Sequence, residues 1–281
     1  MREPGKNKKI LIALPAFNEE VNIQHLLPLL EQWKMDVIVI DDGSTDQTAN
    51  VVKEMGFACF SRESNQGLSG FFNTARVHAI QHKYTHIISL DADGQHDPQY
   101  ISLFIKELEH FDLVSGNRFH DLSIVPASKI ASNLFAIMLF RKFLNIKLPD
   151  VACGYRAMKM DAITDFTATS RFGIVYDMLV QHTLAGKQTG FVRIPALYPV
   201  NEPLNTKIPE IIGLLSTIFK YNPSPEVQSM MNAVINKTDF RINISGYQFN
   251  ASLSSQGEYL FKTNILRAKK IFSSIQQETI Q

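Results

Sequence analysis

Two aspartates one residue apart, Asp91 and Asp93, are the strongest sign of chemistry in this sequence. They directly follow an apolar run at residues 85–90, and side chains at alternate positions of an extended chain project to the same side. Paired carboxylates supply the hard oxygen ligands that Mg²⁺ and Mn²⁺ prefer, and a diphosphate can complete the coordination shell. A solvated loop or a helix cap is the alternative. The position behind a buried run favours a metal and diphosphate site.

Two other polar clusters also follow short apolar runs. The run at residues 36–40 leads into Asp-Asp-Gly-Ser-Thr-Asp at 41–46, where a carboxylate can accept hydrogen bonds from a base or from ribose hydroxyls. The run at residues 9–14 leads into Pro-Ala-Phe-Asn-Glu-Glu at 15–20, which offers a rigid turn, an aromatic ring and polar groups. Helix capping is the alternative explanation, above all for Asp46.

These clusters need a scaffold that brings them together. Continuous apolar runs of this length are typical of strands buried on both faces of a parallel sheet. We expect helices at residues 20–33, 45–55, 70–82, 124–144 and 175–185, and a further strand at 191–194. The alternation of strand and helix predicts an α/β fold with right-handed crossovers. In such sheets ligands bind beyond the carboxyl ends of the strands, which is where all three clusters fall.

Composition limits the possible functions. A chain of 281 residues with 45% hydrophobic and 20% charged residues fits one globular domain, alone or with an appendage. The net charge of +1 lacks the basic excess of a nucleic-acid-binding protein. The two cysteines have no paired spacing, so we expect neither a disulfide framework nor a zinc site. We see no signal peptide and no apolar run near the ~20 residues that span a bilayer, and we expect a cytoplasmic protein.

Five motifs, LPAFNEE, VIVIDDGSTDQT, ISLDADGQHDP, SGNRF and DVACGYRAM, carry a family resemblance. In order and spacing they resemble family 2 glycosyltransferases of the GT-A fold, and within them the dolichol-phosphate mannose synthase and polyprenyl-phosphate glycosyltransferase branch. The resemblance covers about residues 8–210. We therefore expect a GT-A domain at residues 1–210 and a C-terminal extension of unknown role at 211–281. It implies inverting transfer of a sugar from a nucleotide-diphosphate donor, a GDP- or UDP-sugar, with Mg²⁺ or Mn²⁺.

The resemblance also implies roles for individual residues. It places the donor nucleotide against Pro15, Phe17, Glu19, Ile40 and Asp42. It gives the metal and the diphosphate to Asp91, Asp93 and Gln95, with Ala92 as a backbone contact. Arg118 and Lys207 match positions that contact phosphate. Catalysis is expected from Asp93, Arg118 and Asp150. Asp150 or Asp177 would act as general base if the acceptor were a sugar hydroxyl, whereas an anionic lipid phosphate needs no strong base.

The sequence departs from the family pattern at Leu68, Asn201 and Leu204. Leucine at 68 stands where the family often has lysine. Asparagine and leucine at 201 and 204 replace the arginine and the glycine of the branch, which weakens a flexible cationic clamp. These changes leave the sugar and the nucleotide open, and they do not remove the metal site.

The apolar stretch at residues 124–144 carries Lys129, Arg141 and Lys142. It suits a helix lying in a membrane interface, and therefore favours a polyprenyl-phosphate acceptor and peripheral contact with the cytoplasmic face of a membrane. A core helix or a dimer contact is the alternative for this stretch. Two functional alternatives also stay open, namely transfer to a saccharide or protein hydroxyl, and a nucleotide-sugar-binding protein without turnover.

Overall fold

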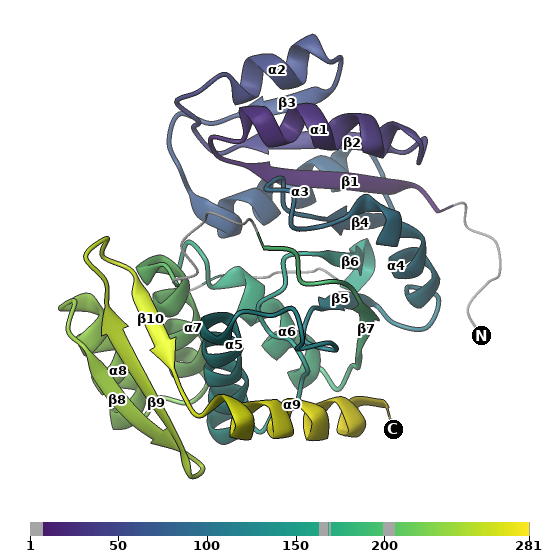
Figure 1. The fold of residues 1–281 in the computed structure, drawn as a ribbon. Coiled ribbons are helices and arrows are strands. Elements are labelled where there is room, and N and C mark those ends of the chain that lie inside the picture. Colours follow the sequence, from purple (N-terminus) through teal and green to yellow (C-terminus); the bar gives the residue numbers. More distant parts are fainter. Residues whose placement is uncertain (1–7, 163–167, 169, 199–205, 281) are drawn as a thin grey trace. The chain divides into compact units, whose positions relative to one another are not determined.

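The computed structural model describes residues 8–162, 168, 170–198 and 206–280 (Figure 1). The chain forms two compact units. Unit 1 comprises Met1–Ser115, Gly154–Asp165 and Gln188–Val192, and unit 2 comprises Gly116–Cys153, Phe166–Lys187 and Arg193–Gln281. The predicted border at residue 210 lies within unit 2, and a functional boundary there stays a prediction.

Most of a seven-stranded sheet lies in unit 1. Its strands are β1 (Ile10–Ala16), β2 (Asp36–Asp41), β3 (Ala58–Ser61), β4 (His86–Ser89), β5 (Leu113–Asn117), β6 (Arg156–Lys159) and β7 (Thr189–Arg193). The strand order is β3-β2-β1-β4-β6-β5-β7. Strands β3, β2, β1 and β4 run parallel to one another, whereas β6 is antiparallel to both of its neighbours. The predicted α/β fold with a mostly parallel sheet is therefore confirmed.

The helices of unit 1 flank this sheet. They are α1 (Glu20–Glu31), α2 (Thr48–Glu54), α3 (Gly67–Gln81) and α4 (Ile101–Glu107), with short 3₁₀ turns at Pro98–Tyr100 and Met160–Ala162. In α1 the apolar residues recur at helical spacing and form one buried face, which consists of Ile23, Leu26, Leu27 and Leu30. Val21 lies off this face and is exposed. The short strand β3 escaped prediction because its residues are mostly exposed and carry no apolar run.

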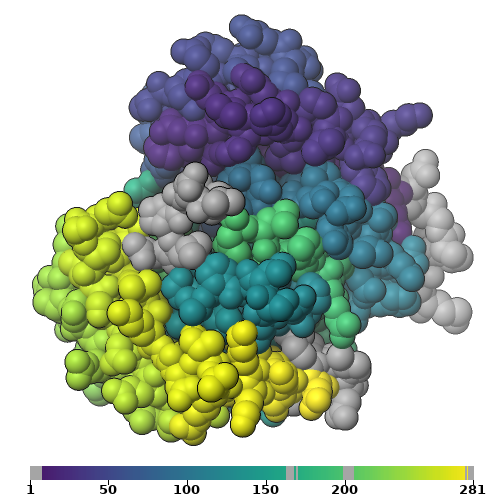
Figure 2. All heavy atoms as spheres, viewed as in Figure 1, coloured from purple at the N-terminus to yellow at the C-terminus, as the bar shows by residue number. Residues whose placement is uncertain are grey.

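Unit 2 contains the remaining helices and a second sheet. Its elements are α5 (Ala127–Leu139) with a π-helical turn (Phe140–Leu144), α6 (Ile174–Leu184), α7 (Ile208–Tyr221), α8 (Pro225–Ile235), β8 (Phe240–Ile244), β9 (Tyr247–Leu253), β10 (Tyr259–Lys262) and α9 (Ile265–Ile280). The three strands form an antiparallel sheet in the order β10-β9-β8. Helix α5 packs against β10 and α9 within unit 2 (Figure 1), and the yellow C-terminal atoms border the teal segment on the face shown in Figure 2.

The apolar surface of α5 is therefore part of a core. Nine of its residues are buried, and Phe135 packs against the rings of Phe249 and Phe261, with ring centroids 5.6 and 4.9 Å away. The interpretation of this stretch as a membrane-interface helix is wrong, because the large apolar side chains of α5 are buried in the protein. The core-helix alternative is correct. No helix of the described residues has the length and apolar character needed to cross a membrane.

The C-terminal sheet should contribute strongly to the stability of unit 2. Phe249 is fully buried against α5, so we expect Phe249→Ala to lower the free energy of unfolding by about 3–5 kcal/mol. Leu266 on α9 is 78% exposed, and Leu266→Ala should change it by no more than about 0.5 kcal/mol. Urea denaturation of both variants measures the difference. Equal midpoints would show that the sheet does not stabilise the unit.

Candidate active site

The carboxyl ends of β1, β2 and β4 lie at one edge of the sheet in unit 1. The register pairs Pro15 with Ile40, and the Asp42 amide donates to the carbonyl oxygen of Ala16 at 2.8 Å. The parallel pairing of β1 with β4 brings the aspartate loop to the same edge. Phe17 is 45% exposed there, so its ring is accessible for stacking, whereas the Ile40 side chain is fully buried. The predicted donor residues of unit 1 are thus brought together, and their contacts with a nucleotide stay a prediction.

The loops after β1 and β2 cap each other's helices. The backbone N–H of Thr45 donates to Asn18 Oδ1 at 2.8 Å, and Asn18 adopts a left-handed conformation. The Asp46 carboxylate accepts hydrogen bonds from the N–H groups of Thr48 at 3.0 Å and Glu20 at 3.3 Å. Asp46 lies one residue before the N-cap of α2, and its carboxylate joins the first residues of α1 and α2 at this edge of the sheet.

Asp42 is nearly buried and accepts three hydrogen bonds. Arg62 Nη1 and the backbone N–H of Gln66 donate to Oδ1 at 2.9 and 2.8 Å, and the N–H of Gly67 donates to Oδ2 at 2.7 Å. These contacts tie the start of α3 to the end of β2. Sequence analysis did not identify Arg62, since an isolated arginine behind a short exposed strand carries no recognisable motif. A contact between Asp42 and a nucleoside stays a prediction.

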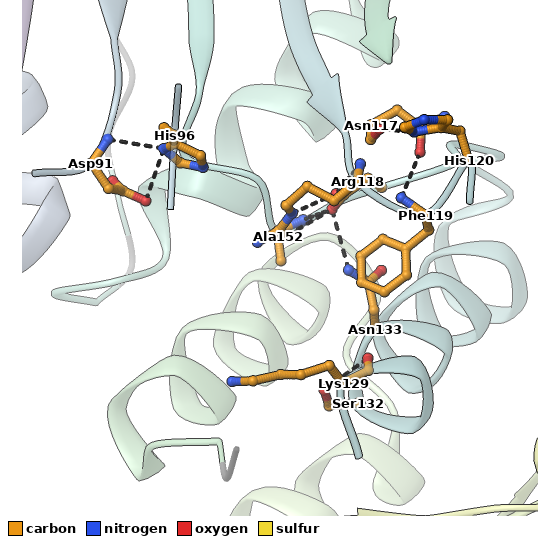
Figure 3. Close-up of polar contacts among 11 residues, drawn as sticks. Asp91, His96, Asn117, Arg118, Phe119, His120, Lys129, Ser132, Asn133 and Ala152 are labelled. Atoms are coloured by element: carbon orange, nitrogen blue, oxygen red, sulfur yellow. Dashed lines mark hydrogen bonds and ion pairs between the residues drawn. The ribbon is translucent and has the colours of Figure 1, made fainter. Parts of the chain in front are cut away.

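The aspartate loop after β4 is held by its own turn and by a buried histidine (Figure 3). The backbone N–H of Asp91 donates to His96 Nδ1 at 2.9 Å, and His96 is only 3% exposed. Gly94 has a φ of +77°, which permits the turn in which the Gln95 N–H donates to Asp93 Oδ1 at 3.0 Å. Ala92 is buried beneath this loop, as expected of a residue that presents only its backbone.

The contacts of His96 also fix its tautomer. Its Nδ1 lies 3.5 Å from Asp91 Oδ2, a contact that would be an ion pair only with a proton on Nδ1. The shorter bond from the backbone N–H requires a lone pair on that nitrogen, so we assign the proton to Nε2 and treat the ring as neutral. Its role in the structure is to position the Asp91 backbone.

Sequence analysis did not single out Gly154, which lies directly against the Asp91 side chain. A Cβ atom at this position would lie 2.7 Å from both carboxylate oxygens of Asp91, so only glycine leaves room for that side chain. The antiparallel register pairs Ser89 of β4 with Arg156 of β6, and two residues further along it places Gly154 opposite Asp91. Ser89 Oγ donates to the Gly154 carbonyl oxygen at 3.0 Å and holds this approach. The glycine of the motif DVACGYRAM was the available signal.

The side chains of the aspartate loop, Asp91, Asp93 and Gln95, fit a divalent metal ion. The glycine at 154 leaves a space for the Asp91 carboxylate, whose side chain is 33% exposed, and Asp93 and Gln95 are also partly exposed. Within the described ranges no group of three or more His, Cys, Asp or Glu side chains forms a protein-only metal site. Two carboxylates suit an ion whose other ligands are water and substrate phosphate, as is common for Mg²⁺.

Unit 2 contains an ion pair between the partly buried Arg118 and the fully buried Asp150. Figure 3 shows Arg118 with Asn133 and Ala152 around it. Arg118 Nε and Nη2 donate to the two carboxylate oxygens at 2.9 and 3.1 Å, and the Arg118 backbone N–H lies 3.3 Å from Oδ2. Asn133 Nδ2 and the Ala152 N–H donate to Oδ1 at 3.2 and 3.0 Å. The carboxylate is thus surrounded by donors from three segments of unit 2.

These contacts set the protonation of the pair. Burial alone would raise the pKa of Asp150, but the Arg118 charge and the hydrogen bonds outweigh it and hold the pKa below its ordinary value. Burial would likewise lower the pKa of Arg118, and Asp150 raises it well above the usual range. A carboxylate held in its charged form by this many donors is a weak proton acceptor. The geometry favours a positioning role for Asp150, and its predicted catalytic role is untested.

The other candidate base, Asp177, also lies in a hydrogen-bonded network. It is fully buried on α6 and accepts from Lys220 Nζ at 3.0 Å and from the Tyr221 hydroxyl at 2.9 Å. Both donors belong to the end of α7. The network links two helices of unit 2 and gives Asp177 a structural role.

Further cations of unit 2 surround the start of α7. Lys207 immediately precedes that helix and is exposed. Burial lowers the pKa of Lys129, Glu210 raises it, and the positive charges of Arg118 and Lys207 lower it further. Burial raises the pKa of Glu210, and Lys129 and Lys207 act in the opposite direction. The positive charges of Arg118 and Lys207 thus both act on Lys129, and such a positive field suits an anionic ligand.

Comparison with known proteins identifies the class of this fold and site. The family model described as glycosyl transferase family 2 matches residues 11–166, more than half of the chain. The chain belongs to glycosyl transferase family 2, and it is a glycosyltransferase.

Two relatives illustrate the range of this family. An uncharacterised protein of Methanocaldococcus jannaschii is 32% identical over 193 residues, covering 63% of this chain and 80% of the relative. The undecaprenyl-phosphate mannosyltransferase of Micrococcus luteus is 24% identical over 208 residues, covering 69% of this chain and 85% of the relative.

A solved structure shows the same fold. Glucosyl-3-phosphoglycerate synthase from Mycobacterium tuberculosis, in complex with Mn²⁺, uridine diphosphate and phosphoglyceric acid, superposes with a TM-score of 0.61 at 16% identity. The match covers 94% of this chain and 92% of the other. This likeness confirms the predicted GT-A fold.

Replacing Gly154 should disable the aspartate site without unfolding the protein. In Gly154→Ala the added methyl group must displace the Asp91 carboxylate, so we expect affinity for Mn²⁺ in the presence of a nucleoside diphosphate to fall by about tenfold or more. Titration calorimetry measures the affinity, and circular dichroism checks the fold. Unchanged affinity in a folded variant would contradict the positioning role of Gly154.

Removing the charge of Asp150 should destabilise the protein in a pH-dependent way. In Asp150→Asn the partly buried Arg118 loses its counter-ion, so we expect a loss of about 3 kcal/mol at pH 7, the lower end of the range for a buried pair. Because the folded-state pKa of Asp150 is lowered, its contribution is complete above its ordinary value of 3.8 and declines as the pH falls through the folded-state pKa. Denaturant titrations of wild type and variant between pH 7 and pH 3 measure this difference. A difference that stays constant down to pH 3 would argue against the ion pair.

Proposed function

We propose that this glycosyltransferase moves a sugar from a GDP- or UDP-sugar to a polyprenyl phosphate, with inversion at the anomeric carbon. The observation that carries the choice of acceptor is the state of the two candidate bases. Asp150 and Asp177 are both buried and both accept hydrogen bonds from cationic side chains. A hydroxyl acceptor would need a base, whereas a phosphate monoester is already anionic near neutrality and attacks without one.

The donor half of the proposal rests on unit 1. Asp91, Asp93 and Gln95 would hold Mg²⁺ or Mn²⁺ and the donor diphosphate at the edge of the sheet. When bound, such an ion offsets the negative charge that grows on the departing nucleotide diphosphate. Phe17 would stack on the base, and the ordered loop around Asp42 would contact the nucleoside. His96 and Gly154 would keep the Asp91 carboxylate in position.

The acceptor half rests on the cations of unit 2. Arg118, Lys129 and Lys207 would bind the acceptor phosphate or the donor phosphates, and the Asp150 pairing would orient the guanidinium. An acceptor oxygen then attacks the anomeric carbon while the bond to the nucleotide diphosphate breaks. The name of the Micrococcus luteus relative supports a lipid phosphate as acceptor. Such an acceptor would bring the enzyme, as a peripheral protein, to the cytoplasmic face of a membrane.

A transfer assay with separate acceptors tests this proposal. The full chain is incubated with labelled GDP- or UDP-hexose, Mn²⁺, and either a polyprenyl phosphate, phosphoglyceric acid or a saccharide. We expect label only in the lipid fraction. Asp93→Ala should lower transfer by about 100-fold or more because a ligand of the metal and diphosphate is lost.

Asp97→Ala is the matched control for this assay. It removes the same charge from the same loop, but the Asp97 side chain caps the 3₁₀ turn at Pro98–Tyr100, so we expect it to retain transfer within a few-fold. Label on phosphoglyceric acid or saccharide would refute the lipid acceptor. Full transfer by Asp93→Ala would refute the metal site.

A further inference from the structure

The C-terminal helix α9 contacts the segment that carries Arg118. The ring of Phe272 stacks on the ring of Phe119, with centroids 5.2 Å apart and planes inclined by only 13°. Phe272 is fully buried and Phe119 is 2% exposed, so this contact is sealed from solvent within unit 2. Phe119 directly follows Arg118, whose guanidinium carbon lies 5.6 Å from the Phe119 ring centroid.

The backbone around Phe119 transmits this contact to the arginine. The Phe119 N–H donates to Asn117 Oδ1 at 3.1 Å, and His120 Nδ1 lies 3.1 Å from the Asn117 carbonyl oxygen (Figure 3). The segment is thus a compact turn whose one large side chain is anchored on α9. A shift of Phe119 would move the adjacent backbone N–H of Arg118, which itself lies 3.3 Å from Asp150 Oδ2.

Helix α9 is also linked to Asp150 through a second helix. Helix α9 also packs along α5, and α5 carries Asn133, which donates to Asp150. Helix α9 therefore contacts the segment of Arg118 through Phe119 and packs on the helix that carries Asn133.

We infer that Phe272 is a positioning residue for sugar transfer, which aligns Arg118 on Asp150 by holding Phe119 in place. The inference rests on the role of Arg118 in the proposed function, and it gives the C-terminal extension a part in the reaction. A displacement of about 1 Å in a group that contacts substrate can lower the catalytic rate by about 100-fold. A residue outside the site can therefore change the rate by shifting one such group.

Two full-length variants separate positioning from general loss of packing. Phe272→Ala removes the ring that stacks on Phe119. Ile275→Ala removes a buried aliphatic side chain one turn further along α9. Nitrogen-15 NMR follows the Arg118 Nε–H, which donates to Asp150 at 2.9 Å in the wild type. We expect its exchange with solvent to quicken by about tenfold or more in Phe272→Ala and to change by less than about twofold in Ile275→Ala.

Kinetics of the same variants supply the second measurement. In Phe272→Ala we expect kcat to fall by about tenfold or more while the donor KM changes by less than about threefold. In an Arg118→Ala background Phe272→Ala should cause no further loss, because both changes remove the same alignment. If Phe272→Ala does not fold, Phe272→Leu serves for the same comparisons.

The outcomes distinguish this inference from the proposed function. Equal Nε–H exchange in Phe272→Ala and Ile275→Ala would overturn the positioning role, whatever the activity. Additive losses of Phe272→Ala and Arg118→Ala would overturn it too. Faster exchange in Phe272→Ala together with full activity of Arg118→Ala would instead support the contact and refute the function proposed for Arg118.

Discussion

The pairing of β4 with β6 is the constraint on which the rest of the site depends. The antiparallel register places Gly154 opposite Asp91, and the approach is so close that any side chain at 154 would displace the Asp91 carboxylate. Ser89 donates a hydrogen bond to the Gly154 carbonyl oxygen and so holds Gly154 in place. His96 accepts a hydrogen bond from the Asp91 N–H and holds the Asp91 backbone. A carboxylate restrained in this way loses little further freedom when a metal ion and a diphosphate bind, so its position can serve affinity as well as catalysis.

In unit 2 a cation is restrained by its neighbours in the same way as the Asp91 carboxylate is in unit 1. Arg118 is held by a buried carboxylate that is itself surrounded by donors, and the low pKa of Asp150 keeps the pair charged. A bidentate pair orients the guanidinium more firmly than a single contact would. Helix α5 contributes Asn133 to this pair, and the C-terminal helix packs on α5 and on Phe119 next to Arg118. The packing of the unit therefore determines the geometry of its charged group.

The sequence predicted the parts of the fold that follow from continuous apolar runs. Strands β1, β2 and β4 and the loops behind them were found because each run ends in a motif. The C-terminal sheet was missed although Phe240, Ile242 and Ile244 alternate with polar residues, because one short amphipathic strand is a weak signal without its partners. The role of Gly154 depends on a pairing with a strand about 70 positions away in the chain, and no local pattern reports such a contact. The apolar stretch of α5 was ambiguous for a related reason, because its composition fits a core and a membrane surface equally well.

Crystals grown with Mn²⁺ and either GDP or UDP would test the central claim most directly, since anomalous scattering locates the manganese independently of any assay. The account predicts one strong peak in contact with the carboxylates of Asp91 and Asp93 and with the diphosphate of the bound nucleotide. A nucleotide bound at this edge of the sheet without manganese beside Asp91, or manganese held by other side chains, would contradict it.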